Sequence, residues 1–193
     1  PNDIVGHSNG NLYFTNPSGR VDPSEREIDF AGVHCIAPDG TVTAVVTNTM
    51  YPNGLAFSPD ERTLYVANTR KDNDCQQEKE RGEVCTHQFI NAYDIAPDGT
   101  ASSGRLFANM HSAEDGVPDG MKVDMEGRVY CTGPEGVWVF DSQGNHLGII
   151  RLTEIPANCA WGGPDNRTMF FTARHSIFTM RMKIPGTPIP QQG

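Results

Sequence analysis

The chain has 193 residues, with 15 Lys and Arg against 24 Asp and Glu, so its formal net charge is −9. This length allows one domain with a substantial core. The negative charge argues against a nucleic acid or an anionic membrane surface as partner, because both need a basic face. No apolar run approaches the ~20 residues of a membrane span. We therefore expect a single domain that binds neither nucleic acid nor membrane.

A turn followed by an apolar strand recurs along the chain, and a second turn pattern alternates with it. The first pattern covers residues 8–14, 58–66, 124–130 and 164–171. The second covers residues 36–41 and 95–100, with a looser copy at 140–145. The Asn-Gly and Asp-Gly pairs in these segments lie between β-branched or aromatic runs, which is the sequence form of a β-hairpin.

Two hairpins in series make a four-stranded meander, and ~40–45 residues per meander is typical of a propeller blade. The repeats predict an all-β propeller with approximate blades at 1–50, 51–115, 116–154 and 155–184, the last with three strands, and a Pro/Gly-rich, irregular tail at 185–193. Apolar residues do not recur at helical spacing over a useful length. We expect this chain to be the C-terminal part of a larger propeller, whose missing N-terminal blades belong to the same gene product and whose N-terminal strand completes the fourth blade.

Asn and Asp residues recur just before the innermost strand of each predicted blade. In a propeller these positions face a common axis, so their side chains should converge at one end of the central channel. Oxygen ligands of this kind suit Ca²⁺, or less selectively Mg²⁺ or Mn²⁺, and no His/Cys cluster has the spacing of a typical zinc site. The alternative is that these are ordinary turn residues that bond their own backbone. The four segments are Pro1-Asn2-Asp3, Pro52-Asn53-Gly54, Pro118-Asp119-Gly120 and Pro156-Ala157-Asn158.

The same segments resemble the regucalcin/gluconolactonase family, also called the SMP-30-like family. Asn2-Asp3 followed by Tyr13-Phe14-Thr15-Asn16-Pro17 is similar to the family's Asn-Asp strand and its Tyr-Phe-Thr-Asp-Pro signature. Pro52–Asp60 and Pro118–Asp124 match the family's next two blade starts, and Asn158–Gly163 is similar to its last blade. The resemblance covers nearly the whole chain. Asn16 departs from the pattern by replacing the usual Asp.

The resemblance implies a six-bladed propeller that binds one divalent cation in the channel and hydrolyses a sugar lactone or related cyclic ester. By position, Asn53 and Asp119 are implied metal ligands, and Asn2 is a further ligand or a substrate contact. Asp119 is the implied general base, with Asp3 as a competing candidate, and Asn158 is a weaker substrate contact. Ca²⁺ is the favoured ion, with Mg²⁺, Mn²⁺ or Zn²⁺ as alternatives. The family's remaining ligand, a Glu near the N-terminus, has no counterpart in this chain.

Two other classes of function remain open. One is a propeller that binds a metal or ligand without turnover, since a fold does not determine a function. The other is an arylesterase or a strictosidine-synthase-like relative, against which the Pro-Asn-Gly and Pro-Asp-Gly-Met strings argue. His111, in a loop that can overhang the channel mouth, is a weaker candidate for contact with substrate. Gly6-His7-Ser8-Asn9-Gly10 fits a nucleophile elbow, but it lacks the helix that this motif requires.

The five cysteines are too few for a disulfide scaffold. Cys75 and Cys85 bracket a very polar stretch, and a disulfide between them would imply an oxidising compartment. The alternative is a pair of free thiols in a cytosolic protein. Asn166 begins a glycosylation sequon, and together these features favour secretion slightly. Cys35, Cys131 and Cys159 lie in apolar runs and are predicted to be core thiols.

Overall fold

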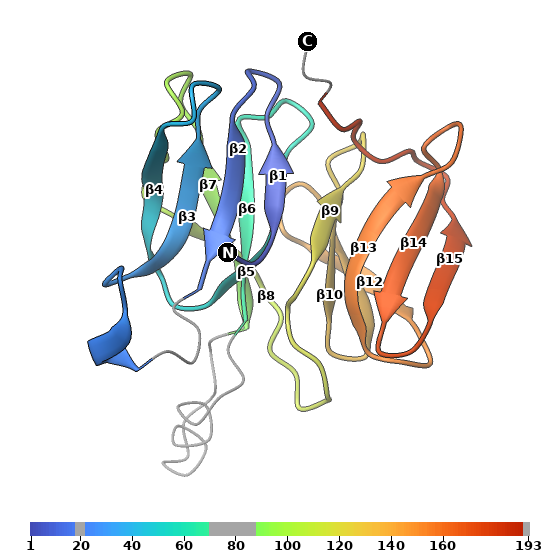
Figure 1. The fold of residues 1–193 in the computed structure, drawn as a ribbon. Coiled ribbons are helices and arrows are strands. Elements are labelled where there is room, and N and C mark those ends of the chain that lie inside the picture. The colour runs from blue at the N-terminus through green and yellow to red at the C-terminus, as the bar shows by residue number, and fades with distance from the viewer. Residues whose placement is uncertain (18–21, 70–87, 191–193) are drawn as a thin grey trace.

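The computed structural model describes residues 1–17, 22–69 and 88–190. Within these residues the strands form four antiparallel sheets, and strands that follow one another in the chain pair side by side. The sheets stand next to one another in chain order (Figure 1). This arrangement is four blades of a β-propeller, so the predicted all-β propeller fold is confirmed. No helix in the described residues has the length and hydropathy that a membrane span needs.

Each blade is a meander. Blade 1 contains β1 (Ile4–Gly6), β2 (Leu12–Asn16), β3 (Ala31–Ile36) and β4 (Val42–Thr49), with the 3-10 turn η1 (Pro23–Glu25) before β3. Blade 2 contains β5 (Pro52–Phe57), β6 (Thr63–Asn68), β7 (Phe89–Asp94) and β8 (Arg105–Asn109). Blade 3 contains β9 (Met121–Val123), β10 (Val129–Gly133), β11 (Gly136–Phe140) and β12 (His146–Arg151). Blade 4 contains β13 (Pro156–Gly162), β14 (Thr168–Ala173) and β15 (Ile177–Arg181).

The repeated turn sequences fold alike. In the copy before β4, Asp39 accepts the N–H of Thr41 at 2.8 Å, and Gly40 donates to Ala37 with φ at +85°. In the copy after β7, Asp98 and Gly99 make the same two bonds, again with φ at +85°. Glycine is the residue that adopts this left-handed conformation at no steric cost. The periodic Asp-Gly pairs therefore mark the tight turns that join the strands.

The core lies between blades rather than inside one layer. Successive side chains of a strand point to opposite faces, so on β6 Leu64 and Val66 pack toward blade 1, whereas Tyr65 and Ala67 pack toward blade 3. A third apolar cluster joins blades 3 and 4. Cys35, Cys131 and Cys159 lie in these clusters as buried free thiols, which confirms their prediction as core residues. Burial raises the pKa of the Cys159 thiol to about 12.

The outer faces of the two end blades, blade 1 and blade 4, are less well covered by other residues. On blade 4, Phe170 and Ile177 lie on the face turned away from blade 3 and are 39% and 70% exposed. On blade 1, Ile4 is 54% exposed. Apolar side chains on two opposite outer faces are what the end blades of an open ring would present.

The C-terminal segment binds to the loops of blades 3 and 4. Thr187 donates to the Val123 carbonyl through its N–H and its hydroxyl, at 3.1 Å each. Gly186 donates to the Asn166 carbonyl at 3.0 Å, and the Asn166 side chain donates back to the Gly186 carbonyl at 2.7 Å. Glycosylation of Asn166 would require that last bond to break. Cys75 and Cys85 lie outside the described residues.

Candidate active site at the blade starts

The first strands of successive blades, β1, β5, β9 and β13, lie next to one another in the middle of the molecule (Figure 1). Backbone bonds join their starts. The Gly54 N–H donates to the Asp119 carbonyl at 3.0 Å, and the Gly120 N–H donates to the Ala157 carbonyl at 2.9 Å. The same position of one blade is therefore bonded directly to that of the next. This brings the Asn and Asp side chains at the blade starts to one end of the channel.

Threonine hydroxyls add a second link between the same blades. Thr15 on β2 donates to the Asn53 carbonyl at 2.7 Å, and Thr132 on β10 lies 3.1 Å from the Ala157 carbonyl. The hydroxyl of Thr69 donates to the Pro118 carbonyl. Sequence reasoning missed these residues, although Thr15 and Thr132 occupy the same place in the repeat, two residues after the Tyr that is the second residue of its strand. These three carbonyls are thus each held by the second strand of the preceding blade or the residue just after it.

Asp119 is the most perturbed acid at these blade starts. Its pKa is raised to about 6, chiefly by burial; a hydrogen bond from the Asn53 side chain partly offsets the rise, and the nearby Asp3 carboxylate adds to it. The structure therefore brings Asp3, Asn53 and Asp119 together. A carboxyl with a pKa near neutrality exchanges protons readily at physiological pH, which is the property of a general base or acid.

One carboxylate oxygen of Asp3 accepts a hydrogen bond from the described residues, and the other does not. Its Oδ1 accepts the Ile4 N–H at 2.8 Å, and its backbone N–H donates to the Thr15 hydroxyl at 3.0 Å. Its Oδ2 is buried and has no hydrogen-bond partner in the described part of the chain. A buried carboxylate oxygen without a partner is costly, so this atom needs a cation, a water or a polar ligand group.

The remaining predicted residues are less closely joined to this group. Asn2 is exposed, and its backbone N–H donates to the Thr15 carbonyl at 2.8 Å. The side chain of Asn158 packs against Gly120, and its Oδ1 accepts the Cys159 N–H at 2.8 Å. That bond is the local turn role that the sequence left open as an alternative. His111 is bonded to Asn109 in its own loop, through its backbone N–H at 2.8 Å.

These donors fit a hard divalent cation better than a soft one. The described residues contain no group of three or more His, Cys, Asp and Glu that could hold a metal. What they offer is carboxylate oxygens from Asp3 and Asp119, with amide oxygens from Asn2 and Asn53. Such oxygens are the ligands that Ca²⁺ and Mg²⁺ prefer, and the open Oδ2 of Asp3 is the atom that a cation would satisfy.

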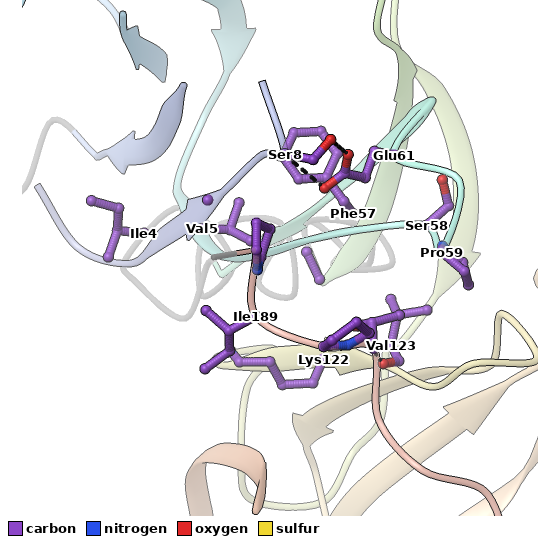
Figure 2. A pocket seen from close by; sticks show the side chains of 15 residues that line it. Ile4, Val5, Ser8, Phe57, Ser58, Pro59, Glu61, Lys122, Val123 and Ile189 are labelled. Atoms are coloured by element: carbon purple, nitrogen blue, oxygen red, sulfur yellow. Dashed lines mark hydrogen bonds between the residues drawn. The ribbon is translucent and has the colours of Figure 1, made fainter. Parts of the chain in front are cut away.

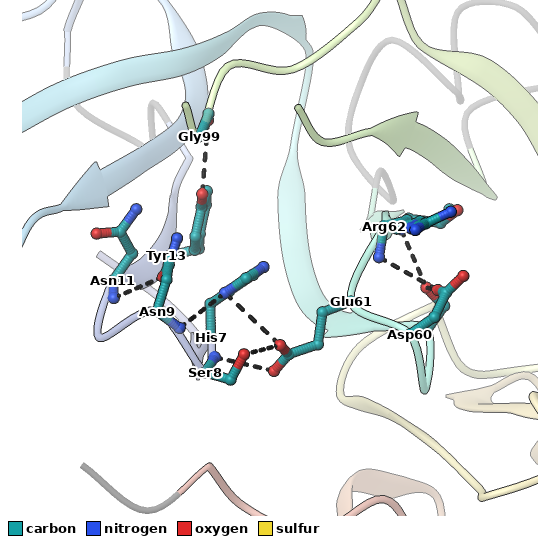
Figure 3. Close-up of polar contacts among 11 residues, drawn as sticks. His7, Ser8, Asn9, Asn11, Tyr13, Asp60, Glu61, Arg62 and Gly99 are labelled. Carbon is teal, nitrogen blue, oxygen red and sulfur yellow. Dashed lines mark hydrogen bonds and ion pairs between the residues drawn. The ribbon is translucent and has the colours of Figure 1, made fainter. Parts of the chain in front are cut away.

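The elbow-like motif around Ser8 lies elsewhere and is not a nucleophile site. It follows β1 and leads through a tight turn into β2, so the helix that the elbow needs is replaced by a strand, as predicted. Ser8 donates its N–H, at 2.9 Å, and its hydroxyl to the carboxylate of Glu61 (Figure 3). His7 Nδ1 accepts the Asn9 N–H at 3.1 Å and lies 3.7 Å from the Glu61 carboxylate. Ser8 and His7 both face Glu61, so the histidine does not activate the hydroxyl.

Comparison with known proteins assigns the chain to a family. Residues 1–175 match the model of the SMP-30/gluconolactonase/LRE-like region. A gluconolactonase of Zymomonas mobilis is 30% identical over 96% of this chain and 51% of its own length. The pentonolactonase XacC of Haloferax volcanii is 32% identical over 84% of this chain and 52% of its own length.

Solved structures agree with this assignment. A gluconolactonase from Xanthomonas campestris superposes with a TM-score of 0.73 at 33% identity, covering 96% of this chain and 57% of that one. A calcium-binding regucalcin from Agrobacterium tumefaciens has the same fold, with a TM-score of 0.70 at 22% identity over 96% of this chain and 61% of that one. The chain spans about half the length of the two curated relatives described above. On its sequence match and its blades, the chain belongs to the SMP-30/gluconolactonase/LRE-like family.

Proposed function

We propose that the protein containing this chain hydrolyses a sugar lactone or a related cyclic ester. The observation that carries this proposal is the Asp119 carboxyl, whose pKa is raised to about 6 and which lies beside Asn53 and Asp3 at the starts of neighbouring blades. The named activities of the relatives support it, since they are a gluconolactonase and a pentonolactonase. The substrate class is therefore a polyhydroxylated cyclic ester.

In the proposed mechanism Asp119 acts as the general base. Its carboxylate takes a proton from a water molecule, whose oxygen forms a bond to the lactone carbonyl carbon. The ring C–O bond then breaks, and the alkoxide that leaves takes a proton from the Asp119 carboxyl, which gives the open hydroxy acid. The Asn53 side chain holds the Asp119 carboxyl in place through its hydrogen bond. Asp3 is the alternative base, because its Oδ2 is buried and unpartnered among the described residues.

A divalent cation, most simply Ca²⁺, belongs to the same proposal. Asn53, Asp119 and Asn2 would hold it together with the open Oδ2 of Asp3, and when bound it would polarise the lactone carbonyl and stabilise the developing oxyanion. The regucalcin from Agrobacterium tumefaciens, a calcium-binding protein of the same fold, supports this choice of ion. Asn158 and His111 remain weaker candidates for substrate contact.

The proposal extends to the whole protein. The exposed apolar side chains of Ile4, Phe170 and Ile177 on the two end faces support further blades in the same polypeptide. The relatives' greater length supports the same conclusion. Two further blades would complete a ring of six.

The decisive experiment is a comparison of Asp119→Asn, Asp3→Asn and the exposed-turn control Asp98→Asn in the protein that contains this chain. Removing a positioned general base costs roughly 10²–10⁴-fold in rate. We expect that loss in kcat/KM on D-glucono-1,5-lactone for Asp119→Asn, with the control unchanged and thermal melts verifying the fold. Full activity of Asp119→Asn would refute the role of Asp119. If only Asp3→Asn lost kcat, Asp3 would be the base.

The cation is tested separately by chelation. Since a ligand that binds only the folded state stabilises it, EDTA should lower both Tm and lactonase activity, and excess Ca²⁺ should restore both. In Asp119→Asn the Ca²⁺-dependent rise in Tm should be much smaller. A Tm that responds to neither EDTA nor Ca²⁺ would contradict the cation site and leave the general-base proposal standing.

A further inference from the structure

A cavity of about 350 Å³ lies at the end of the channel opposite the blade-start acids. Its walls come from β1, β5 and β9, the turns that follow β1 and β5, and the C-terminal segment. Neither Asp3 nor Asp119 lines it, and neither does any other predicted site residue. Small-molecule sites are commonly hollows of this size with mostly apolar walls and a few polar groups. The cavity is therefore a candidate site that the proposed lactone chemistry does not use.

Its walls are largely apolar. Figure 2 shows Val5 and Phe57 on one side of the cavity, with Val123 and Ile189 on the other. Phe57 and Val123 are buried in the core, so each side of the cavity has a rigid part, whereas Ile189 is 86% exposed and forms part of the outer wall. Such walls favour the apolar body of a ligand through the removal of apolar surface from water.

Of the residues that the structure describes, one with a cationic side chain, Lys122, lines the cavity. Lys122 on β9 is partly buried, and its Nζ donates one of its three N–H groups to the Met121 carbonyl at 2.8 Å. In the part of the chain that the structure describes, no carboxylate forms an ion pair with this ammonium. Cys131 and Cys159 lie within its electrostatic reach, but burial raises the pKa of both thiols and keeps them neutral. The Lys122 side chain thus has N–H donors to spare for an anion.

Among the described residues, Glu61 is the one carboxylate on the wall, and it is already bonded. Glu61 accepts the Ser8 N–H at 2.9 Å and the Ser8 hydroxyl, and it lies 3.7 Å from His7 Nδ1. In Figure 2, Ser8 and Glu61 lie across the cavity from Lys122. The negative charge of Glu61 disfavours an anion at that end, so an anionic group is directed to Lys122.

We propose that this cavity binds a small monocarboxylate with an apolar body, its carboxylate paired with Lys122 and its body against Val5, Phe57 and Val123. A partly buried ammonium next to apolar walls gains most from a ligand that supplies both an opposite charge and an apolar surface. A polyhydroxylated acid fits these walls poorly, which separates this ligand class from the product of the proposed lactonase reaction.

The test is isothermal titration calorimetry with hexanoate on the protein that contains this chain. Hexanol tests the apolar body without the carboxylate, and acetate tests the carboxylate without the long apolar body. We expect hexanoate to bind at least tenfold more tightly than either probe. Lys122→Met should weaken hexanoate binding at least tenfold, while Lys183→Met, which removes an exposed lysine outside the cavity, should not. Asp119→Asn should bind hexanoate as the wild type does.

A second variant tests the proposal even if Lys122→Met unfolds. Ile189→Asp changes an exposed wall residue, so it should fold, and its carboxylate should weaken hexanoate binding by competing for the ammonium. The proposal is overturned if hexanoate does not bind, if hexanol binds equally well, or if both variants bind like the wild type. Loss of binding in Asp119→Asn would also overturn it, because the carboxylate would then bind at the blade-start acids.

Discussion

Gly54 on blade 2 and Asp119 on blade 3 are joined by a hydrogen bond of 3.0 Å from the N–H of the first to the carbonyl of the second. The contact is so close that a Cβ on Gly54 would lie 2.1 Å from that carbonyl oxygen and 2.9 Å from the Gly120 Cα. Gly120 is equally confined, since a Cβ there would lie 2.2 Å from the Asn158 Oδ1. The glycines at the blade starts thus set how closely the acids of neighbouring blades can approach.

Alanine at either position should destabilise the protein. Forcing a methyl group against backbone typically costs about 1–3 kcal/mol, and we expect at least that loss in free energy of unfolding for Gly54→Ala and for Gly120→Ala, measured by urea denaturation. Gly6→Ala is the matched control on β1, because its Cβ would meet only Leu12 Cδ2, at 3.7 Å. Equal stability of the three variants would contradict close packing of the blade starts.

The hydroxyl of Thr132 should contribute more to the free energy of unfolding than that of Thr172, its counterpart in the next blade. Thr132 is fully buried, and its Oγ1 lies 3.2 Å from the Gly120 carbonyl and 3.1 Å from the Ala157 carbonyl. Thr172 is exposed and donates within its own blade, at 3.3 Å. Thr132→Val should cost about 1–3 kcal/mol, because buried carbonyls lose their donor. Thr172→Val should leave the urea midpoint nearly unchanged, and a similar shift for both would argue against the link between blades.

Asp124 should be the most sensitive acid for stability. It is fully buried and accepts the N–H groups of Glu126 and Arg128, the Arg128 guanidinium at 3.1 Å and the Tyr130 hydroxyl at 3.1 Å. Asp124→Ala leaves the N–H groups and the Tyr130 hydroxyl without their acceptor, which costs about 1–3 kcal/mol for a buried group, so we expect at least that loss in thermal or urea denaturation. Asp141→Ala, at the solvent-facing turn after β11, should lose less. The reverse order would be inconsistent with a buried network.

The raised pKa of Asp119 predicts a pH dependence in the EDTA-treated protein. Its folded-state pKa of about 6 exceeds the reference value of 3.8, so the folded state holds the proton more tightly than the unfolded state. This contribution to stability is fully present below the reference value and is lost as pH rises through the folded-state pKa. Urea denaturation at several pH values from 4 to 7 should show that decline, and Asp119→Asn should flatten it. A wild-type decline that persists unchanged in the variant would assign it to other groups.

The sequence by itself determined the fold class and the position of the acids. Asp-Gly and Asn-Gly pairs at regular spacing specify tight turns because of local backbone sterics, which need no tertiary contact. The repeat then places Asn2, Asn53 and Asp119 at equivalent points, with Asn158 one residue further along its segment, and equivalent points of propeller blades meet around one axis.

Only the tertiary structure decided what each of those side chains does. Asp119 owes its raised pKa to burial and to Asp3, which lies more than one hundred residues away in sequence. Asn158 bonds its own chain instead of presenting its oxygen freely, and Lys122 lines a cavity whose outer wall is the C-terminal segment. Burial, charge coupling and cavity shape depend on which blades are neighbours, and a local pattern of residues does not contain that information.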